Sequence, residues 1–268
     1  MNSLKTLKNS VCSWLVPQLI DSPTSPNYSY NDTVDYYWPA LIAGVEYYTG
    51  QNQIDYVGHS NGCRVALSSL EQYQETGKNN VAKVQDLQTG QYITVNLQGS
   101  VSTPIVNTFV GVGCPGAFEG ESEFINKVQE NGPAVINFFE NNNIKHVTTR
   151  DVSIQFGLPF LVNIFIDDQT KISRDLLKFY FDITADVQDV NPGNVTINKL
   201  VMMGGIDSPF EVFPFDDGDD DGIVPINDIN GISNKINSLI KVLNIFSESH
   251  NRLVDDNSVK NTIKEELS

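Results

Sequence analysis

The sequence is poor in the residues that cross-linked or metal-binding domains depend on. It has three cysteines and three histidines in 268 residues. Cys12, Cys63 and Cys114 are too scattered for a disulfide framework or a metal cluster. Cys63 and Cys114 lie among apolar residues, so we expect both to be small side chains of the core. A chain of this length buries a large core without cross-links, which indicates one α/β domain with an insertion.

Positive charge and long apolar runs are also scarce. The chain has 17 basic and 33 acidic residues and a net charge of −16, which would repel nucleic acid and anionic membrane surfaces. The sequence contains no run of roughly 20 apolar residues, so it predicts no transmembrane segment. The N-terminal residues lack the apolar stretch of a secretory signal, which leaves the compartment unassigned. We expect no nucleic-acid partner and a small or lipid-like substrate bound by apolar contact, and the sequence leaves the oligomeric state open.

The most informative stretch is Gly58-His59-Ser60-Asn61-Gly62. An apolar strand pattern precedes it at residues 54–57, and an apolar helical face follows it at residues 63–70. A serine at a tight strand-to-helix turn projects its hydroxyl from the sheet, and flanking glycines permit that turn. We therefore predict that Ser60 is a nucleophile. The alternative is an ordinary glycine-rich turn, because a five-residue pattern also arises by chance.

Apolar periodicity predicts the other elements of the chain. We expect helices at 3–15, 32–48 and 259–267, strands at 16–20, 106–112 and 199–204, a hairpin over 82–97, and a helix from 232 that gives way to a strand at 241–246. Strands separated by helices predict an α/β fold with a doubly wound, mostly parallel sheet.

Residues 118–196 break this alternation of strand and helix with several apolar runs. We interpret them as a lid or cap insertion over the site, and additional core helices are the alternative. Residues 1–117 would then form the first part of the core, with the serine turn. Residues 197–268 would form the second part.

A serine nucleophile needs a base to take its proton and a carboxylate to orient that base. Of the three histidines, His59 adjoins Ser60, and we expect its side chain to point away from the hydroxyl. His146 lies in the predicted insertion and is expected at the surface. His250 follows the last strand, where an imidazole reaches the carboxyl edge of the sheet, so it is the preferred base; a polar surface histidine is the alternative.

Three motifs resemble the α/β-hydrolase superfamily, and within it the lipases and esterases. They are the serine turn at 58–62, the segment Asp221-Gly222-Ile223-Val224 after the penultimate strand, and the late His250. The family shares the order Ser, Asp, His. Gly113-Cys114-Pro115-Gly116 is also similar to a small-residue turn of that family. The resemblance implies an α/β-hydrolase fold.

The resemblance further implies a serine hydrolase that cleaves carboxylic esters through an acyl-enzyme. Ser60 would attack, His250 would act as general base, and Asp221 would orient the imidazole. The Asn61 N–H would bind the oxyanion. This chemistry needs no metal or organic cofactor. A thioesterase or acyltransferase with the same triad is an alternative, as is a non-catalytic, calcium-stabilised binding protein on the same scaffold.

The calcium alternative rests on the acidic loop. Asp217, Asp219, Asp221, Gly222 and Asp228 fall on positions 1, 3, 5, 6 and 12 of a calcium loop. The last position usually carries a bidentate Glu, and a second repeat is missing. A merely solvated acidic loop is a third interpretation. Asp221 is not expected to serve a metal and His250 together.

The second oxyanion donor does not follow from the sequence. Lipases of this kind usually carry a His-Gly segment well before the serine, and residues 1–59 contain none. Residues 3–20 are similar to the helix and strand that follow that segment, so the resemblance implies that the first strands of the fold are missing. Three explanations stay open: an incomplete N-terminus, a donor from residues 21–26, or a poor enzyme.

Overall fold

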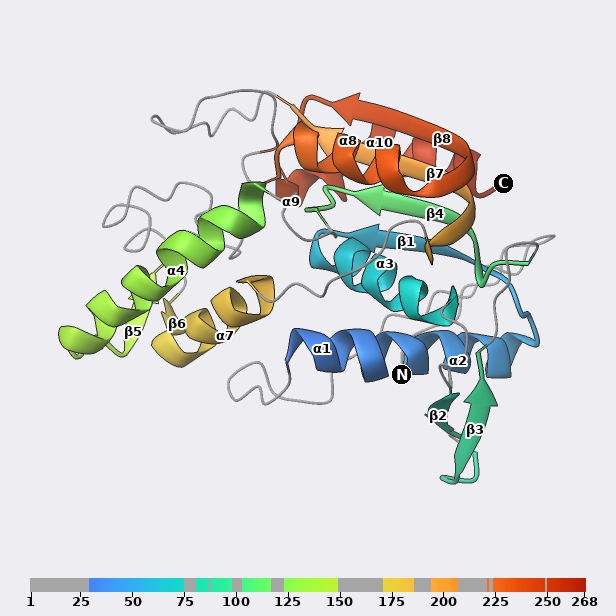
Figure 1. The fold of residues 1–268 in the computed structure, drawn as a ribbon, viewed down its shortest axis with the longest axis horizontal. Helices are drawn as coiled ribbons and strands as arrows, with labels where there is room; N and C mark the ends of the chain where they lie inside the picture. The colour runs from blue at the N-terminus through green and yellow to red at the C-terminus, as the bar shows by residue number, and fades with distance from the viewer. Residues whose placement is uncertain are drawn as a thin grey trace.

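The protein is described by a computed structural model that covers residues 29–74, 81–86, 88–97, 103–116, 123–148, 171–185, 194–206, 221, 224–248 and 250–268. Its centre is a four-stranded sheet in the order β1-β4-β7-β8 (Figure 1). The strands are β1 Ile54–His59, β4 Val106–Val112, β7 Thr196–Gly205 and β8 Asn237–Phe246. All three neighbouring pairs are parallel, which confirms the predicted parallel sheet.

Helices cover both faces of this sheet. Successive side chains of a strand point to opposite faces. Phe109 therefore joins one apolar cluster and Val110 the other. The first cluster contains residues of α2 Trp38–Thr49, α3 Asn61–Gln74 and α8 Ile226–Lys235. The second contains residues of α9 His250–Leu253 and α10 Asn257–Glu266. The fold is thus the doubly wound α/β arrangement that the sequence predicts.

Two predicted elements before and after β1 are confirmed. The helix expected at 32–48 is a continuous helical segment of α1 Tyr30–Asp32, a π-helical turn η1 at Thr33–Tyr37, and α2. Ser29 caps its start, and Gly50 ends it in a left-handed conformation with φ 69°. The hairpin is β2 Val81–Gln85 paired antiparallel with β3 Tyr92–Asn96. The elements expected within residues 3–20 lie outside the described residues.

The boundaries of the helix and strand predicted within residues 232–246 are wrong, and the helix, α8, already begins at Ile226. The helix ends at Lys235, and β8 already begins at Asn237, four residues before the expected strand at 241–246. β8 pairs with β7 over almost its full length, from Thr196↔Asn237 to Gly205↔Phe246. These hydrogen bonds to a neighbouring strand override the local preference of residues 237–240, which periodicity alone does not reveal.

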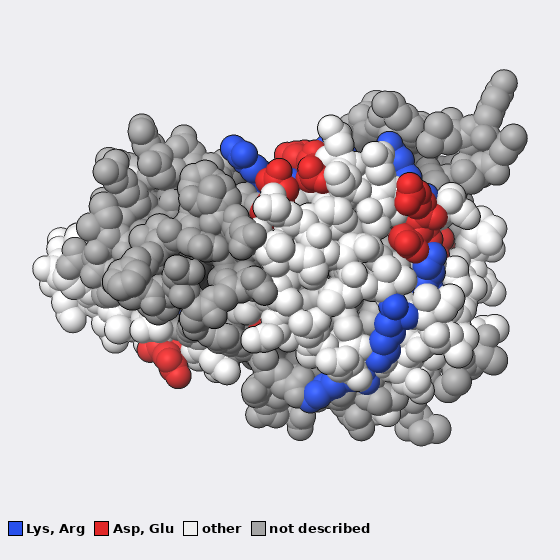
Figure 2. All heavy atoms as spheres, turned by 90° about the horizontal axis from the view of Figure 1, so that it is seen from above, with Lys and Arg blue, Asp and Glu red and all other residues white. Residues whose placement is uncertain are grey.

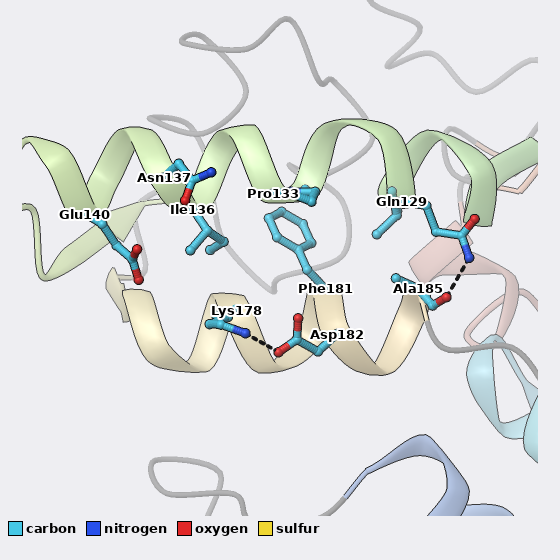
Figure 3. A pocket seen from close by; sticks show the side chains of 11 residues that line it. Gln129, Pro133, Ile136, Asn137, Glu140, Lys178, Phe181, Asp182 and Ala185 are labelled. Carbon is cyan, nitrogen blue, oxygen red and sulfur yellow. Dashed lines mark hydrogen bonds and ion pairs between the residues drawn. The ribbon is translucent and has the colours of Figure 1, made fainter.

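Part of the predicted insertion lies to one side of the sheet (Figure 1). It consists of α4 Glu123–Asn141 and α7 Arg174–Ala185, with the short antiparallel strands β5 His146–Thr148 and β6 Lys171–Ser173. The two helices line a half-open pocket of about 340 Å³. Figure 3 shows Phe181 pointing from α7 towards Pro133 of α4. The boundaries 118–196 and the role as a lid stay predictions.

Two polar contacts lie among the residues that line this pocket. The Lys178 ammonium pairs with the Asp182 carboxylate at 2.5 Å, and the Gln129 side-chain amide donates to the Ala185 carbonyl at 2.7 Å (Figure 3). Val128, Ile136 and Phe181 contribute apolar side chains. The lining of the pocket is therefore partly apolar and partly polar.

The surface above β8 is largely uncharged, although the chain is acidic. Figure 2 shows a broad area without charged side chains, with both acidic and basic groups towards its rim. β8 has four exposed apolar side chains, Leu239, Ile240, Leu243 and Ile245, and Leu239 is 87% exposed. No helix in the described part of the chain is long and apolar enough to cross a membrane.

Candidate active site

Ser60 occupies a strained turn between β1 and α3. Its φ is 53°, in the left-handed region that non-glycine residues rarely adopt. Its N–H donates to the Val112 carbonyl at 3.0 Å, and its carbonyl accepts from the Cys63 N–H at 3.0 Å. The first bond fixes the turn to the end of β4, and the second belongs to the start of the helix. This is the geometry predicted for a nucleophile turn.

The two glycines of the motif differ in their packing. A Cβ atom on Gly58 would lie 2.9 Å from both the Cys63 nitrogen and a ring carbon of Tyr56. On Gly62 it would meet only the Tyr56 hydroxyl oxygen, at 3.9 Å. The close approach of β1 to α3 therefore requires Gly58, whereas Gly62 is not crowded. The expectation that both glycines are needed for steric reasons is wrong for Gly62.

Asp221 and His250 form a buried pair. The His250 Nδ1 lies 2.8 Å from the Asp221 Oδ2, and the two side chains are 4% and 0% exposed. The His250 backbone N–H also donates to the Asp221 carbonyl at 2.8 Å. The second carboxylate oxygen, Oδ1, accepts from the Val224 N–H at 2.7 Å. The carboxylate is thus held in place and in turn fixes the orientation of the imidazole.

The strand ends gather these residues at one edge of the sheet. Ser60 follows β1, and His250 comes shortly after β8. Between them, the Gly113 N–H bonds the Met203 carbonyl and the Ile206 N–H bonds the Phe246 carbonyl, each at 2.8 Å. These bonds extend the parallel pairing beyond the strands. The candidate residues therefore lie at the carboxyl edge, where open α/β sheets bind their ligands.

Gly113 supports the pair from the end of β4. Its φ is 52°. A Cβ atom there would lie 2.9 Å from the His250 Nδ1 and 3.1 Å from the Asp221 Oδ2. The backbone thus packs directly against the hydrogen bond between the two side chains. The sequence predicted a small-residue turn at Gly113–Gly116 but gave no sign of this contact.

His59 belongs to the site, which the sequence prediction missed. Its ring centroid lies 4.7 Å from that of His250 at an interplanar angle of 37°. Its Nε2 lies 3.2 Å from the His250 carbonyl oxygen. Burial, and secondarily the charge that His250 can carry, lower the pKa of His59 to about 4. His59 is therefore neutral at neutral pH. His146, by contrast, is exposed in β5 as predicted.

Asn61 is the first residue of α3. An N–H at this position has no carbonyl one turn earlier in the helix to bond, and the helix dipole favours negative charge there. Its side-chain Oδ1 is buried and has no hydrogen-bond partner among the described residues. The backbone of Asn61 thus fits the oxyanion role that the resemblance implies. Residues 21–26, considered for the second donor, lie outside the described residues.

A buried polar cluster lies beneath the turn. The Asp228 carboxylate accepts the Gly116 N–H at 3.1 Å, and the Arg64 guanidinium stacks 4.2 Å over the Tyr30 ring. Arg64 and Cys114 are fully buried. Burial and the adjacent Cys63 raise the pKa of the Cys114 thiol, so it stays protonated and is not a nucleophile. Both cysteines are core residues, as predicted.

The described residues include only part of the predicted calcium loop. Asp217 and Asp219 lie outside them. The oxygens of Asp221 bond His250 and Val224, and Asp228 bonds Gly116 from α8. No group of three or more His, Cys, Asp or Glu side chains in the described ranges is placed to hold a metal ion. Calcium binding by the acidic loop stays a prediction, and it would require Asp221 to give up its hydrogen bond to His250.

Comparison with known proteins gives similarity at the level of structure alone. No family model matches the chain, and no curated protein sequence matches it. Similar solved structures include a lipase-esterase related protein from Clostridium acetobutylicum, at 14% identity and a TM-score of 0.43, covering 88% of this chain and 74% of that one. The meta-cleavage product hydrolase CumD from Pseudomonas fluorescens has 15% identity and a TM-score of 0.42, and the match covers 92% of this chain and 74% of that one. Esterase RhEst1 from Rhodococcus sp. ECU1013 has 14% identity and a TM-score of 0.44, and the match covers 91% of this chain and 76% of that one.

An assignment of activity therefore rests on the geometry of this chain. A parallel sheet carries a strand–serine–helix turn at its carboxyl edge. An aspartate and a histidine follow the serine in that order along the chain. This arrangement fits the layout that the sequence motifs predicted through their resemblance to the α/β-hydrolase superfamily.

Proposed function

We propose that the protein is a serine hydrolase that cleaves carboxylic esters, as esterases and lipases do. The observation that supports this most directly is the buried Asp221–His250 pair at 2.8 Å, at the same sheet edge as Ser60 with its strained backbone. A pair of this kind orients a base next to a serine that projects from a turn.

The proposed reaction begins with attack of the Ser60 oxygen on the ester carbonyl carbon. His250 Nε2 takes the hydroxyl proton, and the Asp221 carboxylate stabilises the imidazolium through Nδ1–H. The carbonyl oxygen becomes an oxyanion that accepts a hydrogen bond from the Asn61 N–H. The intermediate collapses when the imidazolium returns the proton to the departing alcohol, which leaves an acyl group on Ser60.

Hydrolysis of the acyl-enzyme repeats these steps with water. His250 removes a proton from the water as its oxygen attacks the acyl carbon, and the same proton then passes to the Ser60 oxygen. The carboxylic acid is released and the enzyme is restored. Residues 118–196 are apolar in composition, which supports a substrate with a hydrophobic acyl part. A thiol or second alcohol in place of water would give the thioesterase or acyltransferase alternative.

A fluorophosphonate probe tests the proposal because it reacts with activated serines. We expect labelling of Ser60, identified by peptide mass, and hydrolysis of a short-chain p-nitrophenyl ester. Ser60→Ala should abolish both while the melting temperature stays close to that of the wild type. Ser258→Ala, at an exposed position in α10, is the matched control and should keep both. A folded wild-type protein that is neither labelled nor active would contradict the proposal, and a melting temperature that rises with calcium would then favour the binding-protein alternative.

A further inference from the structure

His59 joins the nucleophile turn to the base. It directly precedes Ser60 in the chain, and its side chain contacts both the ring and the backbone carbonyl of His250. These two histidines are 191 residues apart in sequence. Apart from the backbone of the sheet, this is a direct link between the two segments that the proposed reaction must hold in register.

The hydrogen bond fixes the protonation of His59. A carbonyl oxygen only accepts, so the His59 Nε2 must carry the hydrogen and donate it to the His250 carbonyl. Among the residues that the structure describes, the ionisable groups that face His59 are His250 and Asp221. A neutral ring is suited to this place, because a positive charge would oppose formation of the imidazolium on His250.

The bond completes the support of His250. The His250 N–H and Nδ1 are both bound to Asp221, so Asp221 alone would hold one side of the residue. Helix α9, which starts at His250, is only four residues long and provides little rigidity of its own. The His59 donor holds the carbonyl on the other side, and its ring packs against one face of the imidazole.

We propose that His59 is a positioning residue that fixes His250 relative to Ser60, through the Nε2–H bond to the His250 carbonyl. This inference rests on the proposed function, because it assigns His59 to the same catalytic site. His59 does not exchange protons with the substrate. It limits the positions of the imidazole, and turnover depends steeply on such positions.

Two variants separate the hydrogen bond from the ring. His59→Phe keeps an aromatic ring against His250 but has no donor, whereas His59→Gln keeps a donor at a similar reach without the ring. We expect His59→Phe to lower kcat about three- to tenfold, the range for one neutral hydrogen bond, with KM within about twofold. His59→Gln should retain kcat within about twofold of the wild type. His146→Phe, the same change at the exposed histidine of β5, is the control and should change neither constant.

A spectroscopic readout distinguishes positioning from a general loss of stability. The Nδ1 proton between His250 and Asp221 should give a downfield proton resonance in the wild type. We expect His59→Phe to broaden it and His59→Gln to preserve it, at pH values where all variants are folded. Equal kcat and equal resonances in the wild type and His59→Phe would overturn the inference, as would an equal loss of kcat in both variants with the resonance unchanged. Fluorophosphonate labelling of the wild type is measured in parallel, so failure of the proposed function is recognised separately.

Discussion

The site at the sheet edge and the helical pair α4–α7 differ in how closely their parts pack. At the site, a methyl group on Gly113 would come within 3.1 Å of both Asp221 and His250. Between the helices there is a half-open pocket of about 340 Å³, and a methyl group on Gly132 would meet the Phe181 ring at an ordinary 3.4 Å. Catalytic groups must be held within about 0.5 Å of their working geometry. We therefore expect substitutions at the site to change turnover and substitutions in the helical pair to change stability.

The largest effect is expected for Asp221→Asn. An amide keeps an oxygen for the Val224 N–H but turns its NH₂ towards His250 and favours the wrong tautomer of the imidazole. We expect kcat for ester hydrolysis to fall about 10⁴-fold, as for loss of a triad carboxylate, with little change in KM. Asp255→Asn is the control, because the Asp255 side chain is 86% exposed. A decrease of less than about tenfold would remove Asp221 from the proposed triad.

The second-largest loss of turnover is expected for Gly113→Ala. The methyl group would push on the bond between His250 and Asp221, and the positive φ adds strain of about 1–2 kcal/mol. We expect kcat to fall about 10²-fold and chemical denaturation to show a lower free energy of unfolding.

Gly50→Ala separates the strain of a positive φ from the crowding of the bond between His250 and Asp221. Gly50 also has a positive φ, of 69°, but a Cβ atom there has nothing within 4 Å. We expect a similar backbone strain with unchanged kcat. If both alanine variants kept full activity, the close packing behind the pair would be irrelevant to turnover.

The sequence predicted the parts of the site that depend on local pattern. The strand β4 was predicted at residues 106–112 and is Val106–Val112, because an unbroken apolar run of this length fits a buried strand. The serine turn was also predicted, since the strand, the small residues and the helix are contiguous in the chain. The roles of Asp221 and His250 came from the order of motifs and the resemblance, and they stay proposals.

The parts that depend on contacts between distant segments were not predicted. For His59 the sequence predicted only a side chain that points away from the Ser60 hydroxyl, because nothing in residues 54–73 indicates that His250 would lie against it. The exact support from Gly113 depends likewise on how the ends of β4 and β8 meet. The start of β8 was missed because Asn237 and Ser238 are placed by their pairing with β7. Local periodicity contains none of this information.

The third prediction concerns the helical pair. Phe181 is 6% exposed and lies between α4 and α7 (Figure 3). We expect Phe181→Ala to lower the free energy of unfolding by about 3 kcal/mol, measured by urea denaturation. Turnover per folded molecule should stay within about twofold of the wild type. Tyr36→Ala, at a tyrosine that is 68% exposed, is the control and should change stability little.

A change in KM would sharpen the comparison in another way. If Phe181→Ala raised KM several-fold while kcat stayed constant, the helical pair would contact the substrate, as a lid does. An unchanged KM would restrict the role of α4 and α7 to the fold.

The smallest effect is expected for Gly132→Ala in α4. Alanine is favoured over glycine inside a helix by about 1 kcal/mol, and its methyl group fits against Phe181 at 3.4 Å. Pro133 opposes this gain, because a proline crowds the Cβ of the residue before it in a helix. The two contributions are similar in size, so we expect the free energy of unfolding to change by less than about 0.5 kcal/mol and kcat not at all. A loss above about 1 kcal/mol would mean that α4 packs as tightly at Gly132 as the site does at Gly113, and the contrast between the two regions would then be wrong.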